Sequence, residues 1–153
     1  MNRILFAGSL ALAFVAGATA TRVLPTSQAQ AQAPQLTPIV IHVPDLAGDK
    51  LSMPSGTGMR NKALVIQEGM TLAVQHGPVP KHYHANAHEI QYYLEGTGTI
   101  WLGDKEVQIK PGDLVIIPKG TTHGGTKVEG GGHFKAIAIK TPPQKPDDIK
   151  LVN

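Results

Sequence analysis

The sequence KHYHANAHEIQYYLEG, which runs from Lys81 to Gly96, contains three candidate metal ligands within eight residues. His82 and His84 point to the same side if the backbone is extended, because side chains alternate along a β-strand. Glu89 lies at an odd spacing from His84, so residues 85–87 must form a turn before its carboxylate can face the same point. The sequence therefore predicts a β-hairpin that gathers two imidazoles and a carboxylate, which are ligands suited to a divalent metal.

A fourth candidate ligand, His123, ends the sequence GDLVIIPKGTTH of residues 112–123. A turn there precedes the apolar run Leu114–Ile117, which is typical of a strand buried on both faces. Pro118 and Gly120 then bend the chain, so that His123 opens the next strand in a position from which it can point inward. We therefore expect His123 to be available as a further ligand.

The rest of the chain consists of short apolar runs separated by turn residues. Its 153 residues include 17 glycines and 12 prolines, and no stretch has the periodicity of a strong helix. The expected strands are Ile39–Val43, Lys62–Gln67, Met70–Gln75, a strand that begins at His88, Gly98–Leu102, Lys105–Ile109, Leu114–Ile117 and His133–Lys140. Strands at this spacing predict a single all-β domain, either an antiparallel barrel or a sandwich.

With these residues in place, the chain resembles the cupin superfamily, whose two motifs are GxxxxxHxHxxx(x)ExxxxxxG and GxxxxxPxGxxHxxxN. The matching residues are His82, His84, Glu89 and Gly96 in the first motif and Gly112, Pro118, Gly120 and His123 in the second. Gly77 lies one residue too close to His82, and Lys127 replaces the last asparagine, but neither position is a metal ligand. The resemblance covers roughly residues 62–140, and the combined spacing makes it specific.

The resemblance implies an all-β cupin jelly-roll β-barrel, an antiparallel double-sheet barrel, with one divalent transition metal inside. The implied ligands are His82, His84, Glu89 and His123. His88 is the alternative to Glu89, but the six-residue gap before Gly96 favours Glu89. Fe, Mn, Cu, Zn and Ni are all compatible with three imidazoles and one carboxylate.

Strand alternation after Glu89 divides the following residues between two surfaces. Gln91 and Tyr93 point inward with Glu89, so we expect them to bind and orient the substrate. The residues that point outward are Ile90, Tyr92 and Leu94. This row is too apolar for a surface that faces water, and we expect it to form a homodimer interface. The alternative is that a terminal segment of the same chain covers it.

Three imidazoles and one carboxylate leave coordination positions open for water, dioxygen or an oxyanion. The sequence therefore favours a metal-dependent enzyme, a dioxygenase-type oxidoreductase that acts on a small oxygen-rich ligand. Glu89 is then a catalytic proton acceptor as well as a ligand. Two alternatives use the same residues, namely a metal-assisted isomerase or lyase of a sugar acid and a non-catalytic cupin that binds a small ligand or a metal.

Residues 1–20 have the features of a secretory signal peptide. A positive charge at Arg3 precedes an apolar run and the cleavage site Ala18-Thr19-Ala20. A second site of the same form ends at Ala33, and an uncut leader that anchors the protein in a membrane is the alternative. We expect a periplasmic or secreted protein.

Residues 21–38 are rich in Ala, Gln, Pro and Thr and predict a disordered linker, followed by the barrel domain at residues 39–141 and a C-terminal tail at residues 142–153. The chain has no cysteine, so its metal ligands must be nitrogen and oxygen atoms. Removal of the leader takes one positive charge from the net charge of +3 and leaves +2. With no basic run, this gives no support for a nucleic-acid or anionic-lipid partner, and the expected partner is a small molecule.

Overall fold

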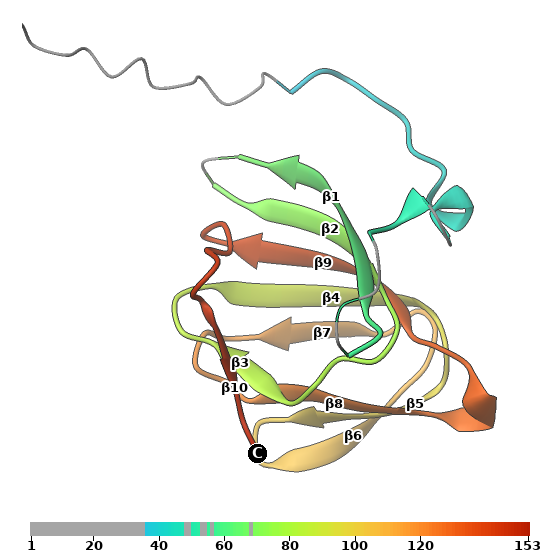
Figure 1. Ribbon diagram of the computed structural model, residues 1–153, viewed down its shortest axis with the longest axis vertical. Helices are drawn as coiled ribbons and strands as arrows, with labels where there is room; N and C mark the ends of the chain where they lie inside the picture. The colour runs from blue at the N-terminus through green and yellow to red at the C-terminus, as the bar shows by residue number, and fades with distance from the viewer. Residues whose placement is uncertain (1–35, 48–49, 53–54, 56, 68) are drawn as a thin grey trace, which may run out of the picture. The chain divides into compact units, whose positions relative to one another are not determined.

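In the part of the chain that the structure describes, ten strands form two antiparallel five-stranded sheets (Figure 1). The first sheet has the strand order β1-β2-β9-β4-β7, and the second has the order β10-β3-β8-β5-β6. The strands are β1 (Arg60–Ile66), β2 (Thr71–His76), β3 (His82–His84), β4 (His88–Glu95), β5 (Gly98–Leu102), β6 (Lys105–Ile109), β7 (Leu114–Ile117), β8 (His123–Val128), β9 (Lys135–Thr141) and β10 (Ile149–Leu151). The predicted all-β, double-sheet jelly roll is confirmed.

The structure is a computed structural model that describes residues 36–47, 50–52, 55, 57–67 and 69–153. The expected signal peptide and all but the last three residues of the expected linker lie outside these ranges. Within them, no helix is both long and apolar enough to cross a membrane. The 3-10 helices η1 (Val43–Asp45) and η3 (Glu129–Gly131) accompany the strands.

Alternation along β4 and β9 determines which side chains face the interior. On β4 the buried residues are Glu89, Gln91 and Tyr93, as the sequence predicted. On β9 the buried alternation that begins at Phe134 and includes Ala138 continues to Lys140. Lys140 is paired with Glu89 across the two strands. The sheet register therefore brings a lysine against a predicted metal ligand.

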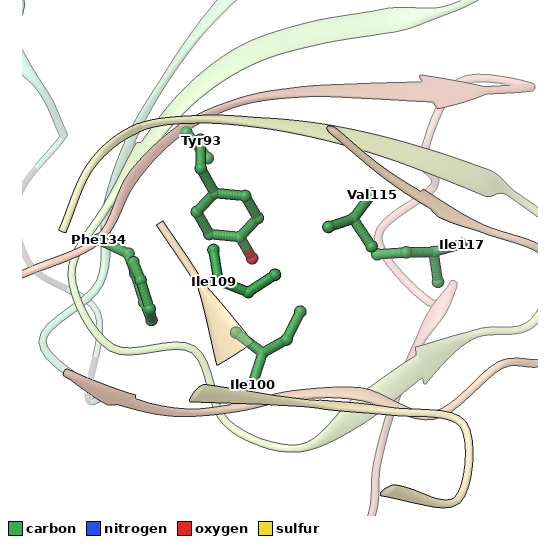
Figure 2. Close-up of a cluster of buried hydrophobic side chains, with 7 residues drawn as sticks. Tyr93, Ile100, Ile109, Val115, Ile117 and Phe134 are labelled. Atoms are coloured by element: carbon green, nitrogen blue, oxygen red, sulfur yellow. The ribbon is translucent and has the colours of Figure 1, made fainter. Parts of the chain in front are cut away.

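Aliphatic and aromatic side chains from both sheets fill one part of the interior. Figure 2 shows this cluster, in which the hydroxyl of Tyr93 points into the space between the two sheets. The cluster consists of Tyr93, Ile100, Ile109, Val115, Ile117, Phe134 and Ala136. Its burial contributes to the hydrophobic stabilisation of the barrel, because each fully buried Val, Ile or Phe side chain contributes about 1.5–3 kcal/mol when it is removed from water.

The strand expected at Ile39–Val43 is absent, and that prediction was wrong. Residues 36–42 have no regular structure, and η1 begins at Val43 with Pro44 in its first turn. Val40 is 98% exposed. A short apolar run reads as a strand, but it forms one only where a partner strand can accept its hydrogen bonds.

The segment after β9 returns to the barrel. The sequence analysis placed residues 142–153 outside the domain as a tail, whereas β10 pairs antiparallel with β3. Ile149 lies opposite His84, and Leu151 lies opposite His82. Three residues after a proline-rich segment are too few to show strand periodicity, so sequence alone did not reveal this strand.

Candidate metal centre

The hairpin of β3 and β4 places three of the predicted ligands. His82 and His84 are buried on one side of β3, and Tyr83 between them is only partly buried. Residues 85–87 lie between the two strands, as the odd spacing required. This break in the register lets the buried Glu89 face the two imidazoles.

His123 joins them from β8, where it is paired with His82 on β3. All four side chains are buried, and one ligand atom from each lies within 4.8 Å of the others. His88 is exposed and accepts a hydrogen bond from the backbone N–H of Lys119 at 3.3 Å. The structure thus gathers the four predicted ligands and leaves the alternative ligand His88 outside the cluster.

Each of the three imidazoles has a hydrogen-bond acceptor at its Nδ1 atom. The acceptors are Pro80 O at 2.8 Å from His82, Asp148 Oδ2 at 3.0 Å from His84 and Thr121 O at 2.9 Å from His123. An acceptor at Nδ1 favours a proton on that atom, so that the lone pair of Nε2 in each ring is available to a bound metal ion. The three rings are therefore held in the tautomer that suits metal binding.

The carboxylate of Glu89 completes the set of lone pairs. Its Oε2 atom lies 3.0 Å from Nε2 of His84 and 3.0 Å from Nε2 of His123. Burial by itself raises the pKa of Glu89, but the contacts with His123 and His84 and the ammonium of Lys140 hold it well below its usual value. Lone pairs of nitrogen and ionised oxygen that converge in this way fit a divalent cation.

The other carboxylate oxygen of Glu89 is held by donors. Gln91 Nε2 donates to Oε1 at 3.0 Å, and Lys140 Nζ lies 3.3 Å from the same atom. Tyr93 in turn donates its hydroxyl proton to Gln91 Oε1 at 2.6 Å. Burial raises the pKa of Tyr93, which keeps this hydroxyl protonated. The chain of donors fixes the Gln91 amide and directs Oε2 of Glu89 toward the histidines.

A cavity of about 410 Å³ adjoins the cluster, within the usual size range of small-ligand sites. Its lining includes the ionisable residues His82, His84, Glu89 and Lys140 and the uncharged polar residues Thr57, Asn61, Thr71, Gln75, Gln91 and Gln144. The apolar wall residues include Ala63, Ile66, Ile149 and Leu151. Tyr93, which was expected to contact the substrate, does not line this cavity and instead lies in the hydrophobic cluster of Figure 2.

Two site residues escaped the sequence analysis, Lys140 and Asp148. The inward position of Lys140 could have been predicted from the two-residue period of β9, because it continues the inward alternation of Phe134, Ala136 and Ala138. Asp148 gave no sequence signal, since it lies in a segment without periodicity. Its carboxylate is buried and accepts hydrogen bonds from the backbone and side-chain amides of Asn86 at 2.7 and 3.1 Å, in addition to its contact with His84.

Gly124 provides a prediction about the support of His82. A Cβ atom at this position would lie 2.3 Å from Pro80 O, the acceptor for His82, and the φ angle of Gly124 is +91°. Because real Cβ atoms do not approach so closely, Gly124→Ala must displace β3 from β8. We expect a loss of about 2–3 kcal/mol in the free energy of unfolding in urea, together with weaker metal binding.

Gly112→Ala is the matched control for this change. Gly112 has a φ angle of +92°, but a Cβ atom there would meet nothing within 4 Å. The control therefore carries the same backbone strain without the steric clash. We expect the free energy of unfolding to fall by about 1 kcal/mol and the metal affinity to stay unchanged. Equal losses in the two variants would contradict the proposed role of the close approach.

His82 makes the metal-free protein sensitive to acid. Burial, together with the neighbouring His123, lowers the pKa of His82 to about 4. The unfolded residue gains a proton below about pH 6.5, whereas the folded residue gains it only near pH 4, so stability falls as the pH decreases through this window. The difference in pKa of this one group lowers the free energy of unfolding by on the order of 3 kcal/mol across the whole window. Urea unfolding of chelator-treated protein between pH 7.5 and 4.5 measures the slope, and His82→Gln should flatten it. An identical slope in the two proteins would refute the assignment.

The comparisons with known proteins agree with this architecture. The cupin-domain family matches residues 69–140. The chain is 33% identical over 73 residues to the uncharacterised protein MJ1618 of Methanocaldococcus jannaschii, a match that covers 46% of this chain and 56% of that protein. It is 43% identical over 42 residues to quercetin 2,3-dioxygenase of Bacillus subtilis, which covers 28% of this chain and 12% of that protein. The chain therefore spans about half the length of the first relative and a small part of the second.

Among solved structures, an uncharacterised conserved protein with a double-stranded β-helix domain from Klebsiella pneumoniae has the same fold. The TM-score is 0.61 at 16% sequence identity, over 76% of this chain and 99% of that one. The family match, this structural similarity and the buried cluster of three histidines and one glutamate all concern the same two sheets. The barrel domain of this chain therefore belongs to the cupin superfamily.

Proposed function

We propose that this protein is a metal-dependent enzyme of the dioxygenase type that acts on a small oxygen-rich ligand. The observation that carries the proposal is that His82, His84 and Glu89 belong to the candidate metal cluster and also line the cavity of about 410 Å³. A cation held by these residues borders a space large enough for a substrate. A closed structural site has no need of such a space. The similarity to quercetin 2,3-dioxygenase over 42 residues supports the same reaction class.

The chain supplies the ligands and the environment of the reaction. When bound, a transition metal supplies a Lewis acid for an oxyanion and a redox centre for dioxygen. Gln91 holds Glu89 in place, and the apolar walls keep bulk water away from the reacting groups. Glu89 is the proposed proton acceptor, because it is the ionised carboxylate that lines the cavity.

Elemental analysis of the purified protein, followed by oxygen-electrode assays with quercetin and with catechol, tests this proposal. We expect about one equivalent of Fe, Mn or Cu and oxygen uptake that a chelator abolishes. Absence of a stoichiometric metal would refute the metalloenzyme. Turnover without oxygen uptake would indicate an isomerase or lyase, and a co-purifying ligand without turnover would indicate a binding protein. Either of these two results would contradict the dioxygenase proposal.

We also propose that the protein is exported to the periplasm or secreted. The support is the positively charged, apolar leader at residues 1–20 with its small-residue cleavage site. Intact-mass measurement of the protein from a cell-envelope fraction distinguishes cleavage after Ala20 from cleavage after Ala33. An uncut mass in the membrane fraction would support an anchor, and an uncut mass in the cytoplasm would refute export.

We further propose a homodimer through the outer face of β4 and β7. Ile90 lies beside Ile116, and Tyr92 lies beside Leu114. Ile116 is 68% exposed and Leu114 is 60% exposed, so the row expected from β4 continues onto an edge strand. Light scattering coupled to gel filtration should give a dimer for the wild type and a monomer for Ile116→Glu.

The matched control for the dimer is Val40→Glu, which places the same charge on an exposed apolar position outside the sheets. We expect this variant to remain dimeric. A monomeric wild type at micromolar concentration would refute the homodimer and favour cover of the face by a terminal segment of the same chain.

A further inference from the structure

Lys140 is a charged group inside the cavity that neither of the two cupin motifs accounts for. It is 4% exposed, lines the cavity and forms an ion pair with Glu89 Oε1 at 3.3 Å. An ammonium has three N–H donors, and this ion pair uses one of them. Lys140 is thus placed to donate to a ligand in the cavity as well as to Glu89.

The charges around the site do not balance without a ligand. A divalent metal contributes +2 and Lys140 contributes +1, while Glu89 and Asp148 each contribute −1, and neutral imidazoles contribute nothing. Among the described residues that line the cavity, Glu89 and Lys140 are the charged ones apart from histidines. The metal-loaded site therefore carries one excess positive charge. Because an uncompensated buried charge is unfavourable, the site favours a ligand with one negative charge.

The rest of the cavity determines the body of that ligand. The apolar part of the wall is formed by Ala63, Ile66, Ala73, Ile149 and Leu151, and uncharged polar side chains are added by Thr57, Asn61, Thr71, Gln75 and Gln144. Against the apolar part a polyhydroxylated sugar acid would lose its hydrogen bonds to water, whereas an aromatic or branched aliphatic body would gain from burial.

We infer that the site takes a small monoanion with an apolar body, such as an aromatic carboxylate or enolate, and that Lys140 determines this specificity by binding its charged oxygen beside the metal. The inference rests on the proposed function, because it requires a metal at the cluster. It adds the chemical class of the ligand and a residue that distinguishes an anion from a neutral molecule of the same shape.

The test uses the full mature protein loaded with Co(II), whose absorption spectrum reports binding at the metal. The probes are benzoate, benzamide and gluconate, which separate the effect of charge from that of the apolar body. We expect benzoate to bind at least about 10-fold more tightly than either of the other two. Lys140→Gln should weaken benzoate binding by at least about 10-fold and leave benzamide unchanged, because the variant removes one partner of a buried charge pair.

Lys140→Arg and Lys135→Gln serve as controls. Lys140→Arg keeps the positive charge and should retain most of the benzoate affinity. Lys135 lies on the same strand, is also buried and forms an ion pair with Glu95 at 3.1 Å, but it does not line the cavity. Lys135→Gln should therefore bind all three probes as the wild type does.

The outcomes separate this inference from the proposed function. Titrations are run at Co(II) concentrations that saturate each variant, as verified by elemental analysis. Equal benzoate affinity in the wild type and Lys140→Gln would overturn the role of Lys140, and preferential binding of gluconate would overturn the apolar body. Failure of Lys140→Gln to load with metal would also overturn the inference, because Lys140 would then serve Glu89 alone. Failure of the wild type to load would refute the proposed function itself.

Discussion

Glu89→Ala is expected to lower the affinity for a divalent transition metal by more than about 100-fold. This exceeds the effect of removing a group that only hydrogen-bonds to a metal ligand. The variant removes the ionised ligand from the cluster. In the wild type, Lys140 Nζ lies 3.3 Å from Glu89 Oε1. Without this carboxylate, the ammonium of Lys140 becomes an unpaired positive charge beside the cation. Competition between the protein and a chromophoric chelator for Zn(II) or Co(II) measures the loss.

Glu95→Ala is the matched control, because Glu95 is on the same strand and forms an ion pair with another buried lysine, Lys135, outside the cluster. Its metal affinity should equal that of the wild type. Glu89→Gln keeps the shape and an oxygen for Gln91 but loses the charge, so it should fall between the alanine variant and the wild type. Metal binding by Glu89→Ala with wild-type affinity would show that Glu89 is not a metal ligand.

Asp148→Ala is expected to lower metal affinity by about 10–100-fold, although Asp148 is not a ligand. Its carboxylate holds the Nδ1 proton of His84 at 3.0 Å and receives two hydrogen bonds from Asn86 in the turn between β3 and β4. Without it the imidazole of His84 is free to rotate and to change tautomer. The same chelator competition measures the affinity, and urea unfolding should show a loss of about 2–4 kcal/mol from the unmatched buried donors.

Asp147→Ala controls for the general effect of a change in this segment, because Asp147 is exposed and next to Asp148. We expect wild-type affinity from it. Asp148→Asn retains an oxygen that can accept hydrogen bonds from Asn86 in the turn. This variant should therefore recover most of the stability but only part of the metal affinity. If Asp148→Ala bound metal as the wild type does, the orienting role of this carboxylate would be wrong.

Much of the site could be predicted from the sequence because it depends on local rules. The alternation of side chains brought His82 and His84 together, and the odd spacing to Glu89 required the turn that the structure contains. The same parity argument, applied to β9, would have found Lys140. These features follow from neighbours along one strand, and a period of two residues is visible in the sequence.

Other features depended on tertiary pairing. Whether a short apolar run becomes a strand depends on a free partner edge, which is why Ile39–Val43 was predicted wrongly while Ile149–Leu151 went unnoticed. Tyr93 pointed inward as expected, but inward on β4 includes both the cavity and the hydrophobic cluster. Alternation gives the side of a strand on which a residue lies, and the packing of the second sheet decides its neighbours.

The position of β10 has a consequence for biosynthesis. Asp148, whose carboxylate orients His84, follows all four predicted ligands in chain order, and the strand after it pairs with the strand that bears two of the ligands. A nascent chain that has already released β3, β4 and β8 from the ribosome therefore still has an incomplete ion-binding centre. Truncation of the chain before Asp148 should therefore affect metal retention before it affects the folding of the central strands.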